Sequence, residues 1–139
     1  MLCCGCRGAK ARQIVATLHV LLFEDDAAIR QTLLDAFEDE GWQTTICNGL
    51  AEIQAAVRQY PSAVLVADSW RVELGRTLSP EYTAEIRSLG QSVPVLLLPS
   101  WGWAHHARPD ELGAAVLPKP FDLGELIQTV RLLAASRTA

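Results

Sequence analysis

No apolar stretch of this 139-residue chain approaches the length of a membrane-spanning helix, which takes roughly 18–20 residues. The N-terminus also lacks a charged region followed by an apolar core, so the sequence predicts no secretory signal. No Walker A loop and no G-x-G-x-x-G loop is present, which leaves a nucleotide site without support. Internal repeats and low-complexity tracts are absent too. These absences indicate a globular protein that does not span a membrane.

Cysteine is scarce in the body of the chain. Three of the four cysteines, Cys3, Cys4 and Cys6, lie at the N-terminus, whereas a secreted disulfide framework would spread them along the sequence. No second ligand cluster with zinc-like spacing accompanies them. We interpret residues 1–16 as a flexible leader, with soft-metal binding and lipidation as alternatives. Cys47 lies in an apolar run and is predicted to be a small buried side chain.

Charge is unevenly distributed. The formal net charge is −4, yet Arg7, Lys10 and Arg12 give the first twelve residues a positive charge with no acid. The remainder is therefore acidic, and an acidic domain is a poor candidate for direct contact with nucleic acid. Half of the residues are hydrophobic, which is ordinary for a globular protein. The length suits one domain with a real core, which we assign to residues 17–139.

Apolar runs alternate five times with segments of helical periodicity. The predicted strands span residues 18–23, 43–47, 63–67, 93–98 and 114–117, and the clear helices span residues 27–40, 50–59, 80–89 and 122–135. This alternation predicts a parallel sheet with helices on both faces. The second strand is the most polar and is predicted at an edge. Between strands four and five, prolines and glycines disrupt the periodicity, so we expect a distorted helix near residues 103–108 or an ordered loop.

Capping residues mark the expected helix ends. Short polar side chains, which can accept hydrogen bonds from the first turn, precede the helices, and glycine follows two of them. The predicted N-caps are Asp26, Asn48, Ser79 and Asp122, and the predicted stops are Gly41 and Gly90.

Acidic residues and one lysine follow three of the predicted strands. Glu24 and Asp25 come after the first strand, Asp68 after the third and Lys119 after the fifth. Ligands of open parallel sheets bind outside the carboxyl ends of the strands, so we expect these side chains to converge. Carboxylates beside one amine suit a hard divalent cation and a phosphoryl group. Alternatively, the acids complement a helix dipole or cap a turn, and Lys119 is a surface lysine.

Four segments, LHVLLFEDD, AVLVAD, VPVLLL and LPKPF, occur in an order and spacing that resembles the receiver domain of bacterial two-component response regulators. The type it resembles is the single-domain receiver seen in chemotaxis regulators, and the similarity runs from about residue 18 to the C-terminus. It implies a flavodoxin-like, doubly wound α/β fold with a five-stranded parallel sheet in the order 2-1-3-4-5. It further implies a cytoplasmic signalling protein, not an enzyme, that at most catalyses its own phosphorylation and dephosphorylation.

The resemblance also implies roles for the clustered residues. Asp68 would be the phosphoacceptor, receiving its phosphoryl group from a sensor histidine kinase or a phosphotransfer protein, and Lys119 would assist the transfer. A Mg²⁺ ion would be bound by Asp25 directly, by Glu24 through water, by Asp68 and by the backbone carbonyl of Trp70. The implied partners are the kinase and a downstream protein target, with no membrane contact. Homodimer formation is left open.

The chain departs from the family where a phosphorylation signal is normally passed on. Pro99 stands where the family carries a serine or threonine hydroxyl, with Ser100 as a substitute if the loop bulges, and Val116 stands at an aromatic switch position. Trp101 and Trp103 replace the usual fourth-helix sequence, and they either cover the site or form a partner surface.

Three functions remain open. We favour a stand-alone but atypical receiver that is phosphorylated on Asp68. The alternative is a pseudo-receiver that acts as a phosphorylation-independent adaptor. A flavodoxin-like enzyme, such as a metal-dependent phosphatase or a flavin binder, is the third hypothesis.

Overall fold

One parallel sheet forms the centre of the computed structural model, which describes residues 17–68, 79–99 and 109–138. Its strands are β1 (His19–Phe23), β2 (Gln43–Ile46), β3 (Val64–Ala67), β4 (Val95–Leu97) and β5 (Ala115–Val116). They lie in the order β2-β1-β3-β4-β5, and every neighbouring pair is parallel. The predicted flavodoxin-like topology is confirmed, and β2 is at an edge as expected. The leader, residues 1–16, lies outside the described residues.

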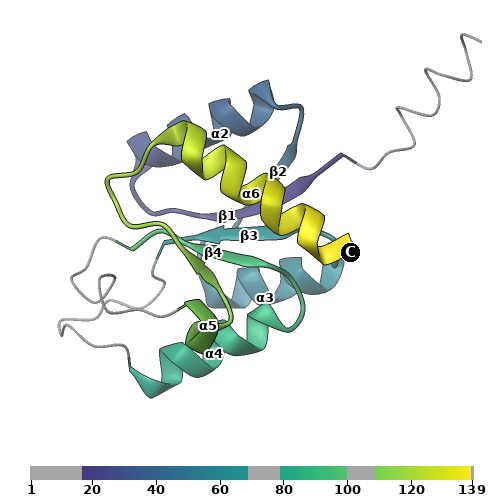
Figure 1. The fold of residues 1–139 in the computed structure, drawn as a ribbon, viewed down its shortest axis with the longest axis vertical. Helices are drawn as coiled ribbons and strands as arrows, with labels where there is room; N and C mark the ends of the chain where they lie inside the picture. Colours follow the sequence, from purple (N-terminus) through teal and green to yellow (C-terminus); the bar gives the residue numbers. More distant parts are fainter. Residues whose placement is uncertain (1–16, 69–78, 100–108, 139) are drawn as a thin grey trace, which may run out of the picture.

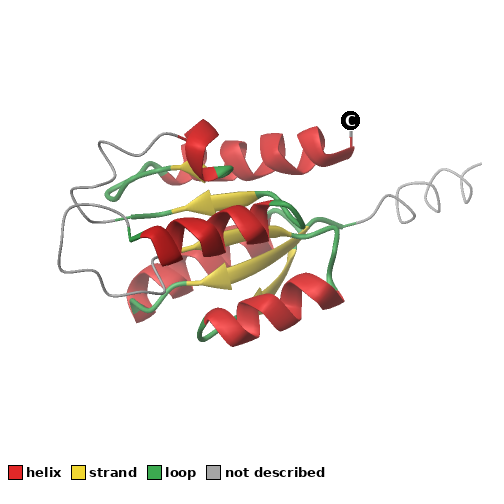
Figure 2. Ribbon diagram, turned by 90° about the horizontal axis from the view of Figure 1, so that it is seen from below, coloured by secondary structure: helices red, strands yellow, loops and turns green. Residues whose placement is uncertain are grey.

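Helices cover both faces of the sheet (Figure 1). They are α2 (Ala27–Asp39), α3 (Leu50–Gln59), α4 (Pro80–Gly90), α5 (Pro109–Leu112) and α6 (Leu123–Thr138). The pair α2 and α6 lies on one face, and α3, α4 and α5 lie on the other. Figure 2 shows the strands between these two layers. Among the described helices, none has both the length and the apolar character needed to cross a membrane.

Alternating side chains of the strands supply the core on each face. In β1, Val20 and Leu22 pack in the cluster beneath α2 and α6, whereas Leu21 and Phe23 pack in the cluster beneath α3 and α4. The whole of β3 is buried as well. Burial on both faces explains why these strands read as unbroken apolar runs in the sequence. Cys47 is buried as predicted, and burial, followed by the charge of Glu52, raises the pKa of its thiol to about 11.

Side-chain caps begin three of the helices as expected. Asp26 accepts from the Ile29 N–H, Ser79 from the Tyr82 N–H and Asp122 from the Glu125 N–H. Gly41 follows the end of α2 with a φ of +80°, the left-handed conformation that favours glycine.

The predicted cap Asn48 is wrong. Helix α3 begins after Gly49, which provides no side-chain cap. Instead, Oε1 of Glu52 reaches back and accepts from the Asn48 N–H at 2.9 Å and from its amide nitrogen at 3.2 Å. This contact resembles the carboxylate half of a capping box, in which an acid of the first turn satisfies a backbone donor before the helix.

The predicted stop Gly90 is also wrong, because this residue is the last one of α4 and Gln91 is the C-cap. A Cβ at position 90 would lie only 2.7 Å from the carbonyl oxygen of Gly113. Glycine is therefore needed for the close approach of the chain after α5, not for a left-handed turn.

Two further boundaries differ from the expectation. Helix α6 continues to Thr138, beyond the predicted end near residue 135. The short helix of the weak segment is α5, which has 4 residues and starts at Pro109. The predicted position of that helix, residues 103–108, lies outside the described residues.

Candidate functional site

Glu24 and Asp68 lie at the same end of the sheet because their strands end level with each other. Phe23 of β1 pairs with Ala67 of β3, and these are the last residues of the two strands. The Asp68 N–H continues the pairing by donating to the Phe23 carbonyl at 2.8 Å. The acids that follow these strands therefore meet at the carboxyl end of the sheet, the usual place of ligand sites in this architecture.

Lys119 forms an ion pair with both acids. Its Nζ lies 3.0 Å from Oε1 and 3.1 Å from Oε2 of Glu24, and 3.4 Å from Oδ2 of Asp68. The Lys119 backbone N–H donates to the carbonyl of Pro99, just past the end of β4. Through its side chain and its backbone, Lys119 thus joins the residues that follow β1, β3 and β4.

Burial makes this ion pair electrostatically strong. Glu24 is 2% exposed and Asp68 is 8% exposed, so water screens their charges poorly. Burial by itself would lower the pKa of Lys119. The hydrogen bond to Glu24 and the negative charges of Asp68 and Glu24 together outweigh it, and they raise the pKa above its usual value. The amine therefore stays protonated at neutral pH.

Three carboxylates cluster at the site. One oxygen each from Glu24, Asp25 and Asp68 lies within 4.8 Å of the others, with Asp25 exposed. Oε1 of Glu24 is buried and accepts no hydrogen bond of suitable geometry, although Lys119 Nζ lies 3.0 Å away. That oxygen keeps a lone pair available for a water or a cation. An all-oxygen donor set with excess negative charge fits Mg²⁺.

Backbone contacts fix Glu24 in place. The Asp26 N–H donates to its Oε2 at 3.2 Å, and Nη1 of Arg30 donates to its carbonyl oxygen at 3.0 Å. The sequence interpretation missed Arg30, which lies one turn inside α2 and gives no signal in the sequence. Asp26 caps α2 and accordingly has a structural role.

An apolar groove of about 440 Å³ opens beside the lysine. It is lined by Ala28, Ile29, Thr32, Leu33, Lys119, Pro120 and Phe121. It lies between the first turns of α2 and the loop that precedes α6. No sequence pattern marked this groove, because its walls are far apart in the chain.

Comparison with known proteins points to one kind of domain. No protein-family model matches the chain. The response regulator MprA of Mycobacterium leprae (strain TN) is 30% identical over 119 residues, which cover 84% of this chain and 50% of that protein. The receiver domain of the Francisella response regulator 1452 is 26% identical, with a TM-score of 0.63, over 88% of this chain and 100% of that domain. In sequence and in fold, the chain matches the receiver domains of response regulators.

The receiver domain spans half or less of the curated relatives that it matches. The DNA-binding transcriptional regulator NtrC of Bradyrhizobium sp. (strain RP501 Parasponia) is also 30% identical, over 80% of this chain but only 23% of that protein. The similarity therefore concerns the receiver portion of these proteins.

Of the residues that depart from the family pattern, the structure describes Pro99 and Val116. Pro99 is buried, and it offers a carbonyl to the Lys119 N–H but no hydroxyl to the site. Val116 is half-buried in β5. The remaining candidates, Trp70, Ser100, Trp101 and Trp103, lie outside the described residues.

Proposed function

We propose that this receiver domain accepts a phosphoryl group on Asp68 from a histidine kinase or a phosphotransfer protein and thereby acts in a phosphorelay. The observation that supports this most directly is the position of Lys119 Nζ, within 3.4 Å of Asp68 and at hydrogen-bonding distance from Glu24. A lysine in this place can exchange its carboxylate contact for a phosphoryl oxygen. Its positive charge would offset the charge that the transfer brings into the site.

The proposed step is a displacement at phosphorus. An oxygen of the Asp68 carboxylate attacks the phosphorus of a phosphohistidine, the P–O bond forms and the P–N bond breaks. The imidazole leaves with the electron pair of that bond and takes up a proton. Phosphoryl transfer needs mainly positioning and charge neutralisation from the protein, and the pairing of β1 with β3 supplies the positioning.

Glu24, Asp25 and Asp68 are the described residues that would hold Mg²⁺. When bound, the ion would neutralise charge on the phosphoryl oxygens. The backbone carbonyl of Trp70 stays a predicted ligand. Asp25 is the most exposed of the three acids and is suited to direct ligation, while Glu24 is held by Lys119 and by the Asp26 N–H and is suited to contact through water.

A second candidate function is a phosphorylation-independent adaptor. Pro99 favours it, because a hydrogen-bond donor missing from the phosphoryl site would slow transfer by about 10²–10³-fold. The acidic cluster and the lysine are both retained, which is why phosphorylation remains the first proposal.

Tryptophan fluorescence with Mg²⁺ and beryllofluoride added in turn tests the first proposal. We expect a saturable beryllofluoride response that requires Mg²⁺ and disappears in Asp68→Asn. The matched control is Glu38→Gln, which removes an exposed acid of α2 outside the cluster and should leave the response unchanged. A response that persists in Asp68→Asn would exclude Asp68 as the phosphoacceptor. No response in the unmodified protein would favour the adaptor.

A further inference from the structure

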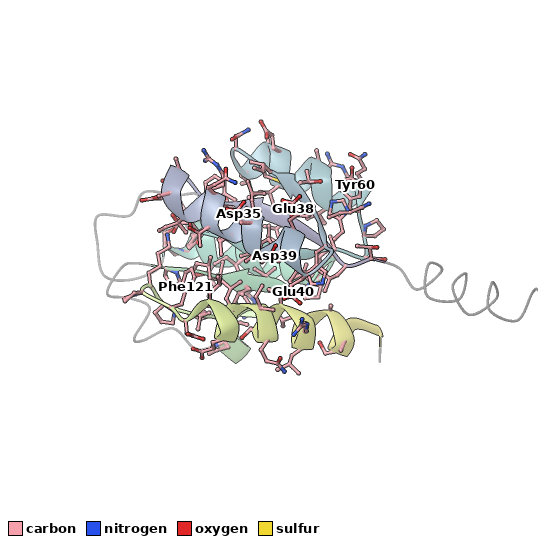
Figure 3. The ribbon with its side chains drawn as sticks, turned by 90° about the horizontal axis from the view of Figure 1, so that it is seen from above. Asp35, Glu38, Asp39, Glu40, Tyr60 and Phe121 are labelled. Atoms are coloured by element: carbon pink, nitrogen blue, oxygen red, sulfur yellow. The ribbon has the colours of Figure 1, made fainter. Side chains whose placement is uncertain are left out.

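A second groove, of about 590 Å³, runs between α2 and α6. Its walls are Thr32, Asp35, Ala36, Asp39, Glu40, Leu123, Gly124, Ile127 and Arg131. Figure 3 shows Asp35 and Asp39 on α2 and Glu40 directly after it, in the layer that also contains α6. The groove thus has an apolar floor and an acidic rim.

Negative charge is in excess along this rim. Asp35, Asp39 and Glu40 are all exposed, and Arg131 is the one basic residue of the lining. Arg131 is already engaged, because its guanidinium pairs with Glu40 and lies 5.8 Å from the centre of the Trp42 ring. The acids Asp35 and Asp39 therefore make the groove complementary to a cationic segment.

The basic leader of the chain enters the fold at the end of the molecule where this rim lies. The Leu18 carbonyl accepts from the Gln43 N–H at 3.0 Å, and Gln43 follows the C-terminal end of α2 by only a few residues. Arg12 lies five residues before Thr17, so an extended chain could place it up to about 17 Å away. Gln43, which is hydrogen-bonded to Leu18, is four residues after Asp39, so Asp39 is at most about 14 Å from the point where the leader begins. The leader is therefore long enough to reach the rim.

We propose that the leader, residues 1–16, docks in the groove between α2 and α6 through Arg7, Lys10 and Arg12. The leader would then be bound to its own domain, whereas the sequence alone suggested a flexible leader. The contact would weaken with salt, because exposed charges are screened within about 8–10 Å at physiological ionic strength. Thr32 lines both this groove and the one beside Lys119. The two grooves therefore adjoin at Thr32, although the docking proposal does not depend on phosphorylation.

Amide hydrogen exchange of the full chain tests this docking through a double-mutant cycle. The variants are R7Q/K10Q/R12Q in the leader, D35N/D39N in the groove, and their combination. At low salt, we expect the leader variant to exchange roughly fivefold faster in the last turns of α2, as a few exposed ion pairs would give. The same leader change should have no effect in the D35N/D39N background. High salt should remove the difference between the unmodified protein and the leader variant.

The matched control is E38Q, which removes an acid of α2 that does not line the groove. In this background the leader change should keep its full effect. Equal exchange in the unmodified protein and the leader variant would overturn the proposal. A protection that grows with protein concentration would overturn it as well, since the occupant would then be the leader of a second copy. Circular dichroism of each variant checks that it is folded.

Discussion

Buried ionic groups lie at the candidate site of this receiver domain. Glu24 is almost fully buried, and Lys119 is its cationic partner. Bringing such charges out of water costs free energy that their attraction only partly offsets, so removal of one partner is strongly destabilising. The pair is therefore better explained by the function of the site than by a contribution to stability.

Replacing Lys119→Met should lower the free energy of unfolding by about 3 kcal/mol at neutral pH, because Glu24 would keep a buried charge without its partner. Denaturant unfolding with a metal chelator present measures this. The double variant Glu24→Gln/Lys119→Met should recover part of the loss. Arg58→Met, which removes an exposed cation of α3, should change stability by less than about 0.5 kcal/mol. A similarly small loss in Lys119→Met would contradict the interpretation.

A second residue-scale prediction concerns pH. Burial lowers the pKa of His19 below its usual value, and its Nε2 lies 2.8 Å from the Thr45 hydroxyl. The unfolded chain therefore binds more protons at this position, so the stability due to neutral His19 is present above the unfolded pKa of 6.5. It is lost as the pH falls through the lower pKa of the folded state. Unfolding of the unmodified protein and His19→Gln between pH 7.5 and about 5 measures this effect. The stability advantage of the unmodified protein over His19→Gln should shrink as the pH falls. A difference in unfolding free energy that stays constant with pH would contradict this role of His19.

At the scale of single elements, the contact between α4 and the chain after α5 restrains the packing closely. Position 90 faces the Gly113 carbonyl, with room for a hydrogen but not for a methyl group. The short α5 thus lies close to α4 only because a glycine stands near the end of that helix.

Gly90→Ala should destabilise the protein, contrary to helix propensity. In an ordinary helix this change adds roughly 1 kcal/mol of stability. Here the new Cβ would meet a backbone oxygen at 2.7 Å, so α4 and the segment after α5 would have to separate. Thermal unfolding should show a lower midpoint for Gly90→Ala, whereas Ser88→Ala at an exposed position of the same helix should be nearly neutral. A higher midpoint for Gly90→Ala would show that the segment around Gly113 can move away from α4 at little cost in free energy.

The elements differ in how well the sequence predicts them. Apolar runs located β1, α2 and α3 closely, and the cap Asp26 marked the start of α2, because these signals are local. The sequence could not show that Gly90 serves a tertiary contact, since Gly113 is distant in the chain. Asn48 is a residue type that often caps helices, but its side chain does not cap α3. Its backbone N–H donates to the Glu52 carboxylate instead. The convergence of Asp68 and Lys119 was predictable because parallel strands end at one edge of the sheet. The hydrogen bond from Arg30 to the Glu24 carbonyl was not predictable, because it depends on the side-chain conformation of Arg30.

The whole molecule assembles the acidic cluster only when it folds. Glu24 and Asp25 follow β1, and Asp68 follows β3, so the cluster joins two distant segments of the chain. The proximity of these acids raises the electrostatic cost of the folded state without a cation. A cation that binds this cluster stabilises the fold, because the unfolded chain has no equivalent site.

Mg²⁺ should therefore raise the stability of the unmodified protein and have little effect on Asp25→Asn. At ten times the dissociation constant, the linkage predicts a gain of about 1.4 kcal/mol in the free energy of unfolding. Without divalent cations, Asp25→Asn should be the more stable of the two, because it relieves repulsion within the cluster. Thermal unfolding across a Mg²⁺ titration measures both effects. Equal gains in the two proteins would place the cation elsewhere.

The register between β1 and β3 makes the site sensitive to the length of these strands. Phe23 pairs with Ala67, and the acids follow both strands directly. Deleting a single residue within β3 would either pull Asp68 back into the sheet or turn its side chain to the opposite face, because strand side chains alternate. Apolar substitutions within these strands would leave the acids at the same level. Variation among related sequences is therefore expected as exchanges of residue type in β1 and β3, with insertions and deletions confined to other segments.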